Sequence, residues 1–232
     1  MSPLDHILAV ILVVVLPLEG RIVFRRLLAA LRVGAPGARV RAYRGTILIQ
    51  WALTLSLLAG WALAARSWNA LGLCLGGPLQ SALGAAGTAG LITLVTLQNR
   101  ALARLSDERL ARLVARSEEI ALLPITPRER AWFTATALTA GVCEEVLCRG
   151  FLLWYLDHWL GSWWSVLAAS GLFGMAHLYQ GAKGVVRTAV VGGLLAALYR
   201  LSGSLLWPIL AHAAIDLGAG MLSKTIARVR AP

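Results

Sequence analysis

The sequence predicts an all-α fold, a polytopic bundle of about seven transmembrane helices with a cytoplasmic amphipathic helix. Hydrophobic residues make up 58% of the 232 residues and charged residues only 14%, whereas a soluble domain carries about 25% charged residues. Apolar runs recur from one end of the chain to the other, which is typical of helices that cross a bilayer. We therefore expect one membrane domain over residues 1–232.

The seven apolar runs divide this domain into two parts. Residues 1–130 are expected to supply the first three spans and the interfacial helix, and residues 131–222 a core of four spans. The first run is short and has no basic residues ahead of it and no small-residue cleavage site, so we interpret it as a span rather than a signal peptide. The candidate spans are residues 4–18, 45–65, 81–97, 131–156, 163–178, 184–199 and 204–222.

Two local patterns lie between the third and fourth spans. In residues 99–123, five apolar residues share one helix face among Arg and Glu, which predicts an interfacial helix; a solvated linker helix is the alternative. Thr126, Pro127 and Glu129 then form the pattern of a capping box, so the next helix is expected to start near Pro127. The apolar face consists of Leu102, Leu105, Leu110, Leu113 and Val114.

The net charge of +11 is distributed asymmetrically along the chain. Nineteen of the 22 basic residues lie in segments that fall on one side of the bilayer, whereas Arg66 and Arg200 lie on the other side. The positive-inside rule therefore predicts an outside N-terminus and a cytoplasmic C-terminus. The basic residues cluster between apolar runs on one side of the membrane, as the positive-inside rule predicts. We therefore expect lipid rather than nucleic acid as the partner. The Arg- and Ala-rich composition is typical of a GC-rich genome and indicates a bacterial inner membrane.

The three cysteines, Cys74, Cys143 and Cys148, do not have the spacing of a disulfide framework or of a zinc motif. We expect Cys143 and Cys148, which flank the two adjacent glutamates on an apolar helix, to act as small buried hydrophobic residues.

Glu144 and Glu145 interrupt the apolar run 131–156. A charged side chain at the centre of a span costs about 2.5–3.5 kcal/mol on insertion scales, so such residues mark a functional site by default. Arg149 shares a helix face with Glu145, four residues earlier, and an ion pair is expected. Glu144 is rotated about 100° away and is expected to point into the bundle. The alternative is that both glutamates are structural.

Two histidines and an aspartate occur in later spans. His177 ends the fifth span, and His212 and Asp216 share a face of the seventh, where the carboxylate can orient the imidazole or supply a second ligand. These groups are suited to activating water. Either Glu144, His177 and His212 hold a metal ion, zinc being the expected one, or Glu144 is the general base for a water positioned by His177. In both cases His212 and Asp216 would stabilise an oxyanion.

Three motifs in this order resemble those of the CPBP intramembrane protease family, the CAAX protease and bacteriocin-processing group, also called Abi. The resemblance covers residues 131–222, and the earlier spans are similar only in general character. The motifs are EExxxR (Glu144, Glu145, Arg149), FxxxH (Phe173, His177) and HxxxD (His212, Asp216).

The resemblance implies an intramembrane endopeptidase that hydrolyses a peptide bond of a membrane-associated peptide or protein substrate. Eukaryotic relatives cleave prenylated CAAX tails, and bacterial relatives are tied to bacteriocin maturation, self-immunity or membrane signalling. It further implies that the six ionisable motif residues are catalytic and that Phe173 is supporting. It leaves open whether zinc or Glu144 alone activates the water.

Two other functions stay open at this point. One is a non-catalytic immunity or membrane-assembly factor that keeps the same scaffold. The other is an ion- or proton-coupled transporter in which the intramembrane Glu, His and Asp form a relay. The motifs leave the substrate and the oligomeric state undetermined.

Overall fold

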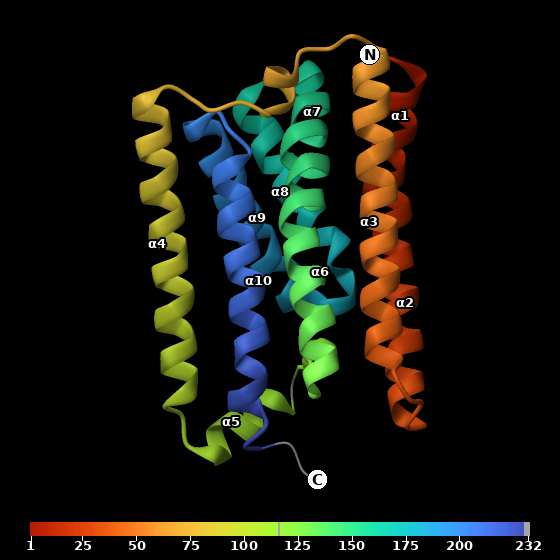
Figure 1. Ribbon diagram of the computed structural model, residues 1–232, viewed down its shortest axis with the longest axis vertical. Helices are drawn as coiled ribbons and strands as arrows, with labels where there is room; N and C mark the ends of the chain where they lie inside the picture. The colour runs from red at the N-terminus through yellow and green to blue at the C-terminus, as the bar shows by residue number, and fades with distance from the viewer. Residues whose placement is uncertain (116, 230–232) are drawn as a thin grey trace.

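The chain forms an upright bundle of long helices in the computed structural model, which describes residues 1–115 and 117–229 (Figure 1). The described part contains no strand, and the all-α fold class is confirmed. Helix α1 starts at the upper end of the bundle in Figure 1 and α10 finishes at the lower end. The elements are α1 (Pro3–Val10), η1 (Ile11–Val15), α2 (Leu16–Arg32), α3 (Ala38–Leu63), η2 (Trp68–Leu71), α4 (Pro78–Ala103), α5 (Asp107–Val114), η3 (Glu118–Leu122), α6 (Pro127–Glu145), η4 (Val146–Leu152), α7 (Leu153–Leu160), α8 (Ser162–Ala176), η5 (Leu178–Gln180), α9 (Gly181–Ser202) and α10 (Leu206–Ile226).

Within the described ranges, five helices are long and apolar enough to cross a membrane, so the expected count of seven is not confirmed. The two remaining candidates are the ones that carry the first two motifs. Glu144, Glu145 and Arg149 make the fourth candidate too polar, and α8 has only 15 residues. The five long helices are Pro3–Arg32, Ala38–Leu63, Pro78–Ala103, Leu178–Ser202 and Leu206–Ile226.

The first helix is longer than the sequence pattern predicted. It runs for 30 residues, from Pro3 to Arg32, through a π-helical turn at Ile11–Val15. The candidate spans 4–18 and 45–65 would leave the seven arginines of residues 20–44 in a connecting segment, but all seven lie in α2 and α3, and only residues 33–37 connect the two helices. An arginine-rich helix end that extends past the apolar segment keeps the same charge asymmetry without a long loop.

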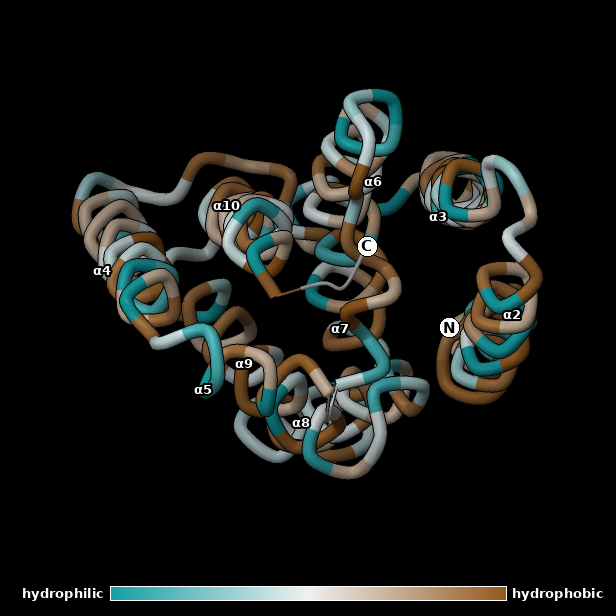
Figure 2. The backbone as a smooth tube through the Cα atoms, turned by 90° about the horizontal axis from the view of Figure 1, so that it is seen from below, coloured by the Kyte–Doolittle hydropathy of each residue, from teal (hydrophilic) through white to brown (hydrophobic). Residues whose placement is uncertain are grey.

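The expected interfacial helix over residues 99–123 is wrong as a single element. Its first residues extend α4 to Ala103, and the rest forms the short helix α5 and the 3₁₀ turn η3. Ser106 precedes α5, and two acidic residues occupy its first turn, an arrangement that favours a new helix start. Figure 2, viewed from below, shows hydrophilic residues at the lower ends of α2 and α6 and in α5.

Helix α6 starts at Pro127, as the capping box predicts. The Thr126 hydroxyl accepts from the backbone N–H of Glu129, and the Glu129 carboxylate accepts from the backbone N–H groups of Ile125 and Thr126. Burial raises the pKa of Glu129, but these two donors and Arg39 outweigh burial and hold the pKa below its usual value. The helix then continues through the π-helical η4 into α7 without interruption, so the glutamates lie within one continuous helix.

Helix α6 lies between α3 on one side and α10 on the other, and this position places the glutamates inside the bundle. The contact with α10 is close because Gly141 faces Ala213, next to His212. The contact between α8 and α9 is also close, since Gly174 faces the carbonyl of Val185. Small residues allow helix backbones to approach closely in membranes.

We predict that Gly141→Ala destabilises the protein by about 1–3 kcal/mol, because overpacking forces two backbones apart. A Cβ at position 141 would lie 2.9 Å from the Cβ of Ala213 and 3.0 Å from its backbone nitrogen. Gly90→Ala in α4 is the matched control, since a Cβ there meets no atom within 4 Å, and it should stabilise the helix by about 0.5–1 kcal/mol. Thermal unfolding in detergent measures both variants, and equal shifts would contradict the close α6–α10 contact.

Candidate active site

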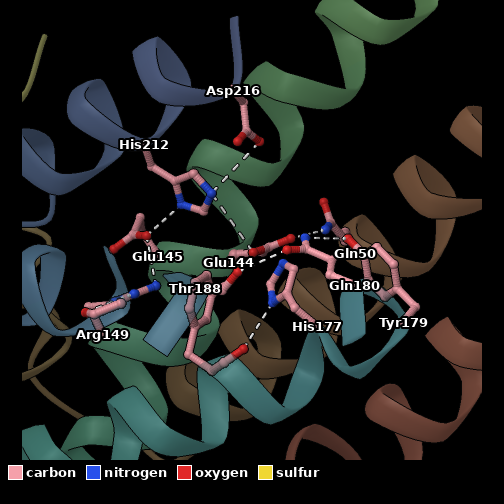
Figure 3. Close-up of polar contacts among 12 residues, drawn as sticks. Gln50, Glu144, Glu145, Arg149, His177, Tyr179, Gln180, Thr188, His212 and Asp216 are labelled. Atoms are coloured by element: carbon pink, nitrogen blue, oxygen red, sulfur yellow. Dashed lines mark hydrogen bonds and ion pairs between the residues drawn. The ribbon is translucent and has the colours of Figure 1, made fainter. Parts of the chain in front are cut away.

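The Glu145 carboxylate joins two of the three motifs. Its Oε1 accepts a hydrogen bond from Nη1 of Arg149 at 2.8 Å, as the i, i+4 spacing predicts. The same oxygen lies 2.7 Å from Nδ1 of His212 on α10. The side chain of Glu145 is fully buried, and its two charged or polar partners offset the cost of burying the carboxylate. Figure 3 shows this connection between α6 and α10.

Arg149 extends the network to two further helices. Its Nη2 donates to the backbone carbonyl of Gly192 on α9 at 3.1 Å. Its guanidinium lies over the ring of Phe173 on α8, with Cζ 4.2 Å from the ring centroid. Phe173 also contacts the rings of His177 and His212, at centroid distances of 4.9 and 6.0 Å. Phe173, itself part of the second motif, therefore contacts one residue of each of the three motifs.

Glu144 points away from the Glu145–Arg149 pair, as expected. Its Oε1 accepts a hydrogen bond from Nε2 of Gln50 on α3 at 2.7 Å. Its Oε2 is buried without a hydrogen-bond partner among the described residues and lies 3.9 Å from Nε2 of His212. One oxygen of this carboxylate is therefore anchored, and the other is left for a water molecule or a substrate.

His177 follows directly after the last residue of α8, where the sequence placed it. Its Nδ1 lies 2.9 Å from the carbonyl oxygen of Phe173. A carbonyl only accepts, so Nδ1 carries the proton and donates it. In the neutral ring Nε2 is then a hydrogen-bond acceptor. Figure 3 shows the imidazole directed toward Glu144.

His212 is oriented by a different carboxylate from the one expected. The spacing favoured Asp216, but Asp216 Oδ2 lies 3.8 Å from Nε2 of His212, beyond hydrogen-bond distance. Glu145 is the hydrogen-bond partner, and it accepts from Nδ1. Nε2 of His212 consequently lies between the carboxylates of Glu144 and Asp216, at nearly equal distances.

A cavity of about 750 Å³ adjoins Glu144 and His177. Its walls come from the first helix, α3, α6, η4 and α8, and most of them are apolar. Arg26 and Arg41 contribute to the wall from the arginine-rich parts of α2 and α3. Apolar lining residues include Leu12, Leu16, Val23, Phe24, Leu27, Ile49, Leu147, Leu152 and Leu172.

The expected metal ligands, Glu144, His177 and His212, do not form a recognisable metal site. Among residues 1–115 and 117–229, no three His, Cys, Asp or Glu side chains are grouped in a way that could hold a metal ion. Each histidine uses only Nδ1 in these contacts, with Phe173 O and with Glu145, and Nε2 of each ring stays available as a ligand. The side chains are therefore not grouped around one point, and zinc stays a prediction from the sequence.

Gln50 is the contact that the motif analysis did not find. It lies in α3, far from the motifs in the sequence, and it is the hydrogen-bond donor to Glu144. An isolated amide in the apolar run 45–65 was the available signal. The three cysteines are free thiols, as expected, and Cys148 lines the cavity one turn after Glu144.

Comparison with known protein families gives a match to the motif-bearing segment. Residues 126–218 match the family model described as Rce1-like, type II CAAX prenyl endopeptidase Rce1-like. The matched segment contains all three motifs, and the match is consistent with a CPBP family intramembrane protease, the resemblance that the motifs carry. No curated protein and no solved structure matches the chain.

We predict that Arg149→Met destabilises the protein by about 3–5 kcal/mol, because it leaves a buried carboxylate without its cation. Glu145→Gln in the same chain removes that charge, so the double variant should be more stable than Arg149→Met alone. The amide oxygen that Glu145→Gln introduces can still accept from His212 in the double variant. Thermal unfolding of the two single variants and the double variant forms a mutant cycle, and strictly additive losses would contradict a buried Glu145–Arg149 pair.

Proposed function

We propose a specific mechanism for this chain. The motif-bearing segment matches the type II CAAX prenyl endopeptidase Rce1-like family, and this match supports a CAAX-type intramembrane protease in general. The protein hydrolyses a peptide bond of a membrane-associated substrate with a water molecule activated by Glu144 and His177. The observation that carries the proposal is Oε2 of Glu144, which has no hydrogen-bond partner among the described residues. This oxygen lies beside Nε2 of His212, and both Glu144 and His177 line the cavity.

In this mechanism Glu144 is the general base. A water molecule bound between Oε2 of Glu144 and Nε2 of His177 gives a proton to the carboxylate, and the resulting hydroxide attacks the scissile carbonyl carbon. The protonated Glu144 then delivers the proton to the leaving amine as the C–N bond breaks. Support comes from the orientation of both groups, since each has one atom held by a hydrogen bond and a second atom with no hydrogen-bond partner among the described residues.

His212 and Asp216 act on the oxyanion in this proposal. The protonated imidazole donates its Nε2 hydrogen to the oxygen that becomes negative in the tetrahedral intermediate. Glu145 holds the opposite nitrogen of the ring, and Asp216 stabilises the charged imidazole from 3.8 Å. Glu145 and Arg149 thus take part by fixing His212 and Phe173 in place, and they do not contact the substrate.

The apolar cavity suits a substrate that reaches the site from the lipid phase. Its walls can accommodate an apolar peptide segment or a lipid chain attached to the peptide, and such pockets bind mainly through apolar surface. The arginines on its wall can contact an acidic group of the substrate. A lipidated peptide is therefore the first substrate to test, beside its unmodified counterpart.

The activity prediction concerns Glu144 and His177. We predict that Glu144→Gln and His177→Ala each lower kcat by at least about 100-fold, the lower end of the range for a lost general base. The assay is cleavage of a farnesylated CAAX-type peptide, its unfarnesylated form and a peptide library by protein in liposomes. His158→Ala is a control, because this histidine contacts the carbonyl of Trp154 outside the site. Full activity in both site variants, or no cleavage by the wild type, would contradict the proposal.

The same assay distinguishes the two ways of activating water. Metal analysis of the purified protein and cleavage in the presence of a chelator test the zinc alternative. The proposed mechanism predicts activity without stoichiometric zinc. Bound zinc that is lost together with activity would overturn the metal-free mechanism and leave the endopeptidase assignment intact.

The orientation of the bundle is the final part of the proposal. The ends of α2, α4 and α10 lie at the lower end of the bundle in Figure 1, and the sequence places most of its basic residues near these ends. This supports a cytoplasmic C-terminus and an outside N-terminus in a bacterial inner membrane. Two variants test this prediction. Both lack the three native cysteines, and one carries Arg32→Cys and the other Ala65→Cys. A membrane-impermeant thiol reagent should label position 65 in intact cells and position 32 only after permeabilisation, and the reverse pattern would contradict the orientation.

A further inference from the structure

Gln50 lies outside the segment that carries the motifs and the family match. It is in α3, about midway through a 26-residue helix whose other residues at this level are mainly apolar. An amide inside a membrane span is costly unless it is hydrogen-bonded, so its position calls for a specific partner. That partner is Glu144, at 2.7 Å.

The chemistry of the contact fixes the orientation of the amide. A carboxylate accepts hydrogen bonds, so the amide nitrogen of Gln50 must face Oε1 of Glu144, and the amide oxygen must face away from it. That oxygen is buried and has no hydrogen-bond partner among the described residues, and the same holds for Oε2 of Glu144. Two buried acceptors at the ends of one contact both need a donor, and a water molecule or a substrate N–H can supply it.

Helix packing holds the amide at this distance from the carboxylate. Helices α3 and α6 pack along their length, and a second hydrogen bond joins them less than two turns away, from Nε1 of Trp51 to Oγ1 of Thr139 at 3.3 Å. This second bond does not touch the site. Removing this bond weakens the contact between α3 and α6 without changing the hydrogen bond to Glu144. It therefore serves as a control for the effect of Gln50 on Glu144.

We propose that Gln50 is a positioning residue for Glu144. Its amide nitrogen anchors Oε1, so that Oε2 is presented toward His212 and the cavity. The inference rests on the proposed function, because positioning matters only if Glu144 is the base. It assigns part of the active site to the N-terminal half of the chain.

The kinetic test compares Gln50→Met with Trp51→Phe. Methionine keeps the length of the side chain and cannot donate, whereas Trp51→Phe removes the other α3–α6 hydrogen bond. We expect Gln50→Met to lower kcat by about 10- to 100-fold, the size of one hydrogen bond to a charged group, with KM changed by less than about twofold. Trp51→Phe should keep kcat within about twofold of the wild type. The substrate is the peptide that the wild type cleaves in the library assay.

Equal kcat in Gln50→Met and the wild type would overturn the inference, and so would equal losses in Gln50→Met and Trp51→Phe. The proposed function fails separately, if Glu144→Gln cleaves like the wild type. A cycle of Gln50→Met and Glu144→Gln, followed by thermal unfolding, tests the contact without any substrate. Non-additive shifts in Tm are expected, and additive shifts would show that the two side chains do not interact.

Discussion

The buried carboxylate of Glu145 is the interaction on which the site depends. One oxygen accepts from Arg149 along α6 and from His212 across the α6–α10 interface. Arg149 in turn holds the carbonyl of Gly192 and stacks on Phe173. A single charge, costly inside a membrane, therefore connects four helices through one oxygen, and loss of either Arg149 or His212 would remove a partner of this buried carboxylate.

The two adjacent glutamates have different contacts and different roles. Because successive helical residues are about 100° apart, Glu145 faces the helix interface while Glu144 faces the cavity. The π-helical turn that follows, Val146–Leu152, contains Arg149 and packs in the hydrophobic core through Phe151. π-helical turns within α-helices are frequent at functional sites, and here the turn begins directly after the two glutamates.

Sequence periodicity was sufficient where the interaction is local. The Glu145–Arg149 pair follows from i, i+4 spacing, and the start of α6 follows from its capping box, since both depend on residues within one turn. The hydrogen-bond partner of His212 could not be found from spacing, for the opposite reason. Asp216 is its neighbour on the helix, but the closer approach of α10 to α6 at Gly141 brings Glu145 nearer, and tertiary packing is not encoded in spacing along one helix.

The boundaries of the helices also show which features local sequence predicts and which depend on tertiary packing. The first helix continues past its apolar run, and residues 99–123 divide into three elements. Both features depend on helix ends and packing, which hydropathy does not resolve. Gln50 illustrates the limit for the site. A single amide in an apolar run indicates that a partner exists, but its partner lies 94 positions later in the chain, and only the packing of α3 on α6 identifies it.

The most direct test of the account is an experimental structure of the wild-type protein with a bound peptide analogue whose central hydroxyl mimics the tetrahedral intermediate. The account predicts that this hydroxyl lies within about 3 Å of Glu144 and His177, that the oxyanion position faces Nε2 of His212, and that the Glu145–His212 hydrogen bond is intact. An analogue bound in the cavity with its hydroxyl directed away from Glu144 would contradict the central claim.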